Sequence, residues 1–290
     1  MFIATLIAPD LPQGEVTAAR DRLDAAGCLP VAQVWIEESE AIDLQFGLDP
    51  DAARAALEGQ SYDVVVQPAE DRRKKLIVAD MDSTMITVEC IDELADYAGI
   101  KAQIAAVTEA AMRGELDFGE ALDARVALLK GLDESVIARC LAERVKIMPG
   151  ARELVRTMRG WGASAILVSG GFTRFAEPVA AEIGFTRAIA NVLEIADGKL
   201  AGTVSKPIVD ASTKLATLSE AVLDLDLSRA ETLAVGDGAN DLAMITQAGL
   251  GVAYHAKPVV AAAAGARIDH GDLTALLFAQ GVARKDWAAG

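Results

Sequence analysis

The amino-acid sequence predicts an α/β protein: a doubly wound, mostly parallel sheet with a helical insertion, preceded by a ferredoxin-like α+β unit. Three observations predict this class. From residue 148 onward, apolar strand-like segments alternate with helix-like segments, which is typical of parallel sheets. Residues 86 to 147 are helix-like and contain no convincing strand. The first 70 residues follow the order β-α-β-β-α-β, which defines the ferredoxin-like unit.

The N-terminal unit is predicted element by element. Apolar and β-branched residues predict strands over residues 2–8, 29–37, 40–48 and 61–69. A helix over residues 14–27 ends at a glycine, and a second helix over residues 49–59 starts with Asp49 as a cap and Pro50 in its first turn. The charged stretch EDRRKK, residues 70–75, is predicted to be a linker.

The doubly wound sheet is predicted from two separate parts of the chain. Its first strand, within residues 74–80, is separated by the helix-like block from later strands within residues 164–171, 231–241, 250–256 and 266–270. Residues 191–205 predict a hairpin around Asp197-Gly198, a favoured two-residue turn. The expected organisation is therefore an N-terminal domain over residues 1–70, a core over residues 75–88 and 148–290, and a four-helix insertion over residues 89–147.

The charge and composition of the chain disfavour several kinds of partner and compartment. The formal net charge is −16, which disfavours nucleic acid and anionic membranes, because both require a basic face. Cys28, Cys90 and Cys140 are far apart and lack metal-ligand spacing, so a reducing compartment is expected. The first residues predict a strand instead of a signal peptide, and no apolar run approaches the ~18 residues of a membrane span. These features predict a cytoplasmic protein.

Acidic side chains follow two of the predicted strands. Asp80 and Asp82 come directly after the apolar run 76–79, and Asp237 follows another apolar run. Adjacent carboxylates repel each other and raise each other's pKa, so a compensating cation is expected. Ligands of doubly wound sheets bind at the carboxyl ends of the strands, and carboxylate oxygens suit Mg²⁺. The sequence thus predicts a Mg²⁺ site, although the stretch around Asp80 by itself also fits a solvated aspartate turn.

A third strand end adds a hydroxyl and glycine amides. Ser169, Gly170 and Gly171 follow an apolar run and can hold phosphate oxygens, although a serine before two glycines is also a common turn. A carboxylate can attack phosphorus and form an aspartyl-phosphate, while a second carboxyl group moves the proton. The three strand ends together therefore predict phosphoryl-transfer chemistry.

These motifs, in this order, resemble those of the haloacid-dehalogenase-like phosphatases: DMDST at residues 80–84, SGG at 169–171, a lysine between, and GDGAND at 236–241. The helical insertion resembles the cap of that superfamily. Longer stretches, at residues 80–99, 110–132, 149–155 and 253–258, are similar to its phosphoserine-phosphatase branch. The resemblance covers residues 75 to 280. The N-terminal unit is similar in layout to the small regulatory, ACT-type domains of many such enzymes.

The resemblance implies roles for the residues around the phosphoryl group. Asp80 is expected to be the nucleophile and a metal ligand, Asp82 the general acid/base that also offers its main-chain carbonyl to the metal, and Asp237 the remaining protein ligand of Mg²⁺. Ser169 and Gly170 are expected to bind the phosphate, and Lys214 is expected to supply a cation to it. Asn240 is expected to contact the substrate, and Asp241 is expected to be a supporting carboxylate.

The resemblance also implies how the remainder of the substrate is recognised. Glu89 is expected to bind an ammonium group, Arg125 a carboxylate, and Met112 and Phe118 are expected to close over them. For Glu89, the position in the first turn of a helix is explained equally well by the helix dipole.

Two assignments stay open at the level of the residues themselves. Lys206 competes with Lys214, because spacing does not separate them. Arg125 shares a predicted helix face with Leu122 and Val126, so it is expected to face an anion, either a substrate carboxylate or a structural acid.

The predicted function is Mg²⁺-dependent hydrolysis of O-phospho-L-serine, the last step of serine synthesis by the phosphorylated route. Opposite charges at Glu89 and Arg125 match a substrate that carries both an ammonium and a carboxylate. Transfer of the phosphoryl group to an acceptor alcohol such as homoserine is the nearest alternative, and an amino-acid-sensing or phospho-acceptor module is a third. A homodimer through the N-terminal domain is expected from similarity.

Overall fold

The structure is a computed structural model that describes residues 1–113 and 115–290, and the side chain of Met112 also lies outside the described part. Its N-terminal unit consists of β1 (Phe2–Ile7), α1 (Gln13–Ala25), β2 (Pro30–Glu37), β3 (Ala41–Phe46), α2 (Pro50–Ala56) and β4 (Asp63–Pro68). The predicted β-α-β-β-α-β order is present. The four strands form an antiparallel sheet in the order β2-β3-β1-β4, and both helices pack with it around a separate core that includes Leu6, Leu23 and Phe46.

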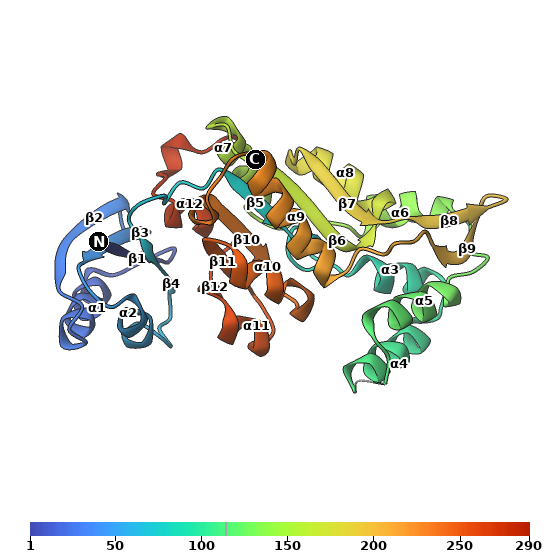
Figure 1. The fold of residues 1–290 in the computed structure, drawn as a ribbon, viewed down its shortest axis with the longest axis horizontal. Helices are drawn as coiled ribbons and strands as arrows, with labels where there is room; N and C mark the ends of the chain where they lie inside the picture. The colour runs from blue at the N-terminus through green and yellow to red at the C-terminus, as the bar shows by residue number, and fades with distance from the viewer. Residues whose placement is uncertain (114) are drawn as a thin grey trace.

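A six-stranded sheet forms the centre of the molecule (Figure 1). It contains β5 (Leu76–Ala79), β6 (Ser164–Phe172), β7 (Arg187–Asn191), β10 (Thr232–Gly236), β11 (Leu250–Tyr254) and β12 (Ala266–Ile268). Their order is β12-β11-β10-β5-β6-β7, and every neighbouring pair is parallel. The chain builds one half outward from β5 and the other outward from β10. These two central strands mark the point where the winding reverses, which is where doubly wound sheets bind ligands.

Helices cover both faces of this sheet, as double winding requires. Against one face lie α7 (Ala151–Gly160), α8 (Thr173–Ile183) and α12 (Ala275–Ala279), and against the other lie α9 (Ala211–Asp224), α10 (Leu242–Gln247) and α11 (Pro258–Ala263). Along β5, Ile77 and Ala79 belong to the first apolar cluster and Leu76 and Val78 to the second, because successive strand residues point to opposite faces. The predicted doubly wound core is therefore present.

The helical insertion lies at the opposite end of the molecule from the N-terminal unit (Figure 1). It comprises α3 (Cys90–Tyr97), α4 (Lys101–Met112), α5 (Phe118–Leu128) and α6 (Ser135–Glu143). The predicted hairpin is formed by β8 (Leu193–Ala196) and β9 (Lys199–Val204), with Asp197 and Gly198 both at positive φ. This hairpin supports the insertion, since Leu200 exchanges backbone hydrogen bonds with Gly131 and Leu132. Among the described helices, none has the length and apolar character that crossing a bilayer requires.

The predicted linker is mostly exposed, but Arg72 is half-buried and Lys74 is buried, and both contact the folded parts on either side. The Arg72 guanidinium forms an ion pair with Asp43 in the N-terminal sheet (2.5 Å) and donates to the Ala279 carbonyl at the end of α12 (2.8 Å). Lys74 is buried, its ammonium donates to the carbonyl oxygens of Asp71 and Ala230, and burial lowers its pKa to about 8. A run of charged residues predicts solvent exposure from composition alone, and within this run Lys74 is the buried exception.

A second contact joins the N-terminal unit to the core through Asp63, the first residue of β4. Its carboxylate is 3% exposed and accepts hydrogen bonds from the backbone amides of Asp269, His270 and Gly271, at 2.7, 3.1 and 2.7 Å. These amides lie in the loop after β12. Because each amide donates to a buried charged acceptor, this contact fixes the loop firmly against the N-terminal unit.

Candidate active site

Three carboxylates meet where the two central strands end. Asp80 follows β5 and Asp237 follows β10, and these strands are neighbours in register, with Ala79 opposite Val235. The Asp80 amide donates to the Val235 carbonyl at 3.0 Å, which fixes the turn that points Asp80 into the site. Asp241, at the end of the short 3₁₀ helix Ala239–Asp241, completes the group: one carboxylate oxygen of each residue lies within 4.8 Å of the others.

This group of acids has the chemistry of a divalent-cation site. Desolvation, followed by repulsion from Asp80, raises the pKa of Asp237 to about 6 and also raises the pKa of Asp241. A cation bound among the three oxygens would remove that repulsion, and hard oxygen donors suit Mg²⁺. The family resemblance implies only a supporting position for Asp241, whereas the structure places its carboxylate beside Asp80 and Asp237.

Lys214 is buried between two of these carboxylates. Its ammonium lies 2.6 Å from Asp80 and 2.6 Å from Asp241, and its side chain is 0% exposed. Burial acts to lower the pKa of Lys214, but the two carboxylates outweigh that effect and raise it above its ordinary value. The competitor Lys206 instead pairs with Asp123 on the surface at 2.8 Å. The structure therefore places Lys214, and not Lys206, against Asp80.

Asp82 lies outside the group of three acids that could hold a metal. It is half-buried, and its Oδ1 accepts a hydrogen bond from the Cys90 amide at the start of α3 (3.1 Å). Desolvation, with added repulsion from Glu89 and Asp80, raises the pKa of Asp82 to about 8. A carboxyl group with a raised pKa keeps its proton to higher pH than an ordinary aspartate and can donate it, as a general acid must. The main-chain carbonyl of Asp82 stays a predicted metal ligand.

Two glycines allow the site to be this compact. A Cβ on Gly171 would lie 2.8 Å from Asp82 Oδ2, and a Cβ on Gly236 would lie 2.4 Å from the Asp241 carboxyl carbon. Neither contact is sterically allowed, so both positions require glycine if the acids are to keep their places.

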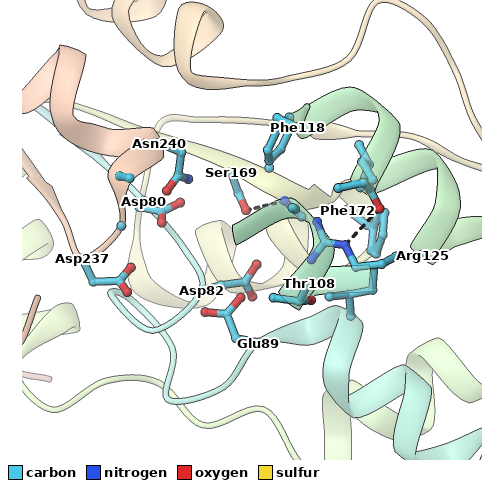
Figure 2. Close-up of a pocket in the computed structure, with 18 of the residues that line it drawn as sticks. Asp80, Asp82, Glu89, Thr108, Phe118, Arg125, Ser169, Phe172, Asp237 and Asn240 are labelled. Atoms are coloured by element: carbon cyan, nitrogen blue, oxygen red, sulfur yellow. Dashed lines mark hydrogen bonds between the residues drawn. The ribbon is translucent and has the colours of Figure 1, made fainter. Parts of the chain in front are cut away.

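Ser169 lies in the C-terminal half of β6, close to the acids (Figure 2). It is 1% exposed, and its hydroxyl oxygen accepts the Gly171 amide at 2.8 Å, so its own proton remains available for a phosphate oxygen. The position of Gly170 is set by Asn191, which the sequence analysis missed. The Asn191 amide group donates to the Gly170 carbonyl (2.8 Å) and its oxygen accepts the Val209 amide (2.8 Å). An asparagine at the end of a strand, here β7, was the only sequence signal for this role.

A cavity of about 410 Å³ joins these groups to the helical insertion. Arg125 on α5 reaches into the cavity from the side opposite Asp80 and Asp237 (Figure 2). Its guanidinium faces Asp82 and Glu89. Its Nε donates to the Ala121 carbonyl at 3.2 Å, and it forms no ion pair with any residue that the structure describes. The structural acid that the sequence left open as a partner is therefore absent from the described residues, and the guanidinium fork faces the cavity.

Other predicted residues share this cavity. Glu89 precedes α3 without capping it through its side chain, lines the cavity, and accepts the Ser83 hydroxyl at 2.8 Å. Phe118 and Asn240 line the same space (Figure 2), whereas the side chain of Met112 lies outside the described residues. Thr108 and Lys257 also line it, and neither was predicted from the sequence to have a role.

Comparison with known proteins gives concordant matches. The sequence model of the haloacid dehalogenase-like hydrolase family matches residues 77–246. A protein named phosphoserine phosphatase from Streptomyces coelicolor is 44% identical over 235 residues, which are 81% of this chain and 57% of that protein. One of the same name from Archaeoglobus fulgidus is 42% identical, over 82% of this chain and 72% of its own length. The chain spans 52 to 64% of the length of several curated relatives that it matches.

A solved structure extends the likeness to nearly the whole fold. The crystal structure of a probable phosphoserine phosphatase from Vibrio cholerae superimposes with a TM-score of 0.78 at 33% identity. The superposition covers 98% of this chain and 87% of that one.

Proposed function

The chain belongs to the haloacid dehalogenase-like hydrolase family, and we propose that it hydrolyses O-phospho-L-serine to L-serine and phosphate. The observation that carries this proposal is the charge pattern of the cavity. Asp80, the proposed nucleophile, and Ser169, a proposed phosphate contact, line this cavity together with Glu89 and Arg125, which carry opposite charges. A phosphorylated amino acid carries a phosphate, an ammonium and a carboxylate, which match these three features.

The proposed reaction has two steps. In the first, a carboxylate oxygen of Asp80 forms a bond to phosphorus, the bond from phosphorus to the serine oxygen breaks, and Asp82 gives its proton to that oxygen. In the second, Asp82 takes a proton from water, the water oxygen bonds to phosphorus, and the bond to Asp80 breaks. Asp82 is suited to both directions because its raised pKa, about 8, lies near neutrality.

The remaining groups stabilise the charge that moves. The Lys214 ammonium lies 2.6 Å from Asp80 and balances negative charge on the phosphoryl oxygens. Ser169 and the amides that follow it hold those oxygens, with Asn240 as a further substrate contact. Asp80 and Asp237, with the main-chain carbonyl of Asp82, would hold Mg²⁺, and Asp241 lies close enough to support it. The bound cation would supply positive charge to the transferring phosphoryl group.

The direct test is phosphate release from O-phospho-L-serine by the purified chain, with Mg²⁺ and with a chelator. We expect turnover that requires the divalent cation and that exceeds turnover of glucose 6-phosphate by at least about a hundredfold, because Glu89 and Arg125 pair only with the amino acid. Equal rates on both substrates would contradict the substrate assignment. A new phosphoester formed when homoserine is added would favour the phosphotransferase alternative.

Replacing Arg125 with Gln should separate recognition of the carboxylate from chemistry. We expect kcat/KM for phosphoserine to fall about ten- to hundredfold, because that is what a charge-assisted bidentate contact contributes. For phosphoethanolamine, which lacks the carboxylate, kcat/KM should equal that of the unmodified chain. The matched control is Arg113→Gln, because Arg113 lies in the same insertion but pairs with Glu115 at the surface. Equal losses on both substrates would show that Arg125 does not bind the carboxylate.

For the N-terminal unit we propose an ACT-type role in amino-acid sensing or assembly, with residues 1–70 as one domain, residues 75–88 and 148–290 as the core, and residues 89–147 as the cap. The edge strand β2 exposes Val31 and Val34, which supports assembly into a homodimer. A monomer mass by light scattering at micromolar concentration would argue against the dimer. The free, buried cysteines fit the predicted reducing compartment, and a cytoplasmic location stays a prediction.

A further inference from the structure

Lys257 lies in the active-site cavity without an assigned role. It follows β11, just before α11, and lines the same cavity as Asp80, Glu89 and Asp237. Its side chain forms no ion pair or hydrogen bond with any residue that the structure describes. The other two cations that the site analysis placed here have assigned roles: Lys214 pairs with Asp80 and Asp241, and Arg125 is the proposed partner of the substrate carboxylate. Lys257 is thus an exposed ammonium at the cavity mouth that has no fixed partner among the described residues.

The backbone that carries Lys257 is held in place from both sides. Its own amide donates to the Asp237 carbonyl at 3.2 Å, which ties it to one of the three acids. Two residues earlier, the His255 amide donates to the Ile268 carbonyl (2.9 Å), and the His255 ring lies 2.9 Å from the Gly271 carbonyl. Gly271 in turn donates its amide to Asp63 of the N-terminal unit. These contacts hold the backbone of Lys257 in place, so its ammonium moves mainly by rotation about the bonds of its own side chain.

The cavity that Lys257 lines is rich in acidic side chains. Asp80, Asp82, Glu89 and Asp237 all line the cavity, and the chain as a whole has a net charge of −16. A phosphate monoester that approaches such an opening is repelled unless cations stand at the entrance. Lys257 lines the cavity beside Asp237, and its backbone amide donates to the Asp237 carbonyl, so its ammonium belongs to the same opening as these acids.

We propose that Lys257 captures the phosphate-bearing substrate at the cavity mouth and thereby raises kcat/KM, with little influence on the chemical step. This inference rests on the proposed function, because it takes the ligand to be a phosphate monoester. It differs from the role of Lys214, which is buried against the nucleophile and acts on the phosphoryl group after binding. A long-range attraction of this kind weakens as salt screens it, whereas a buried contact does not.

The test compares Lys257→Gln and Lys257→Glu with Lys285→Gln, which removes the same charge from an exposed lysine far along the chain at the C-terminal 3₁₀ helix. At about 10 mM ionic strength we expect kcat/KM to fall about tenfold for Lys257→Gln and further for Lys257→Glu, with kcat changed less than about twofold. At about 0.5 M ionic strength the deficit of Lys257→Gln should shrink to about twofold. Lys285→Gln should match the unmodified chain throughout.

Two outcomes overturn the proposal: equal kcat/KM for the Lys257→Gln and Lys285→Gln variants at low salt, or a loss in kcat that does not depend on salt. Failure of the proposed function is recognised separately, because the unmodified chain would then not release phosphate from phosphoserine. In that case, binding of inorganic phosphate with Mg²⁺, measured by calorimetry, replaces turnover. The inference then requires weaker and less salt-dependent phosphate binding by Lys257→Gln than by Lys285→Gln.

Discussion

Replacing Asp80 with Asn is expected to reduce phosphate release by about four orders of magnitude or more, because the carboxylate oxygen that forms the covalent intermediate is lost. The asparagine side chain has nearly the same shape as that of aspartate, so the fold should persist. Lys214 would keep its ion pair with Asp241 at 2.6 Å. Steady-state phosphate release, alongside thermal unfolding of the same sample, measures both effects.

The matched control for this substitution is Asp123→Asn. Asp123 is an exposed carboxylate that pairs with Lys206 at 2.8 Å and lies outside the residues that line the cavity. We expect its variant to keep full activity. Substantial activity in Asp80→Asn, within about tenfold of the unmodified chain, would show that another group attacks phosphorus.

The second large effect is expected at Lys214. Lys214→Met removes a buried cation that lies 2.6 Å from each of two carboxylates, and leaves Asp80 and Asp241 close together without compensation. Breaking a buried ion pair by removing one partner costs about 3–5 kcal/mol of unfolding free energy. Catalysis should fall as well, because the phosphoryl oxygens lose a neutralising charge. Denaturant unfolding and phosphate release measure the two losses.

A divalent cation gives this prediction a sharper form. Because Asp80, Asp237 and Asp241 form the candidate cation site, added Mg²⁺ should raise the melting temperature of Lys214→Met by more than that of the unmodified chain. Lys206→Met serves as the control, since Lys206 is an exposed lysine. Loss of stability and activity in Lys206→Met, with little change in Lys214→Met, would reverse the assignment of the two lysines.

The arrangement of the strand ends could be predicted from the sequence. Apolar runs alternate with helical segments from β6 onward, and such runs form parallel strands whose carboxyl ends share one edge of a sheet. Asp80, Ser169 and Asp237 each follow such a run, so their convergence required no knowledge of side-chain packing. The hairpin at Asp197-Gly198 was predictable for the same reason, because its turn chemistry is local.

Contacts between distant segments could not be predicted in this way. The choice between Lys206 and Lys214 depends on how α9 packs against β5 and on the short helix that carries Asp241. The stretch EDRRKK has the composition of a solvated linker, but Arg72 and Lys74 bind carbonyl groups more than a hundred residues away, and Lys74 is buried. Asn191 carries no sequence pattern that links it to Gly170.

The sequence by itself determined which chemical groups this protein brings to one edge of its central sheet, because strand periodicity and local turn signals act over a few residues. Only the tertiary structure decided which of those groups touch. It placed Asp241 beside Asp80 and Asp237, buried Lys214 between two carboxylates, and left Lys257 free at the cavity mouth among the described residues. The physical reason is that ion pairing and desolvation depend on distances of a few ångströms between residues far apart in the chain, which packing sets and local pattern does not.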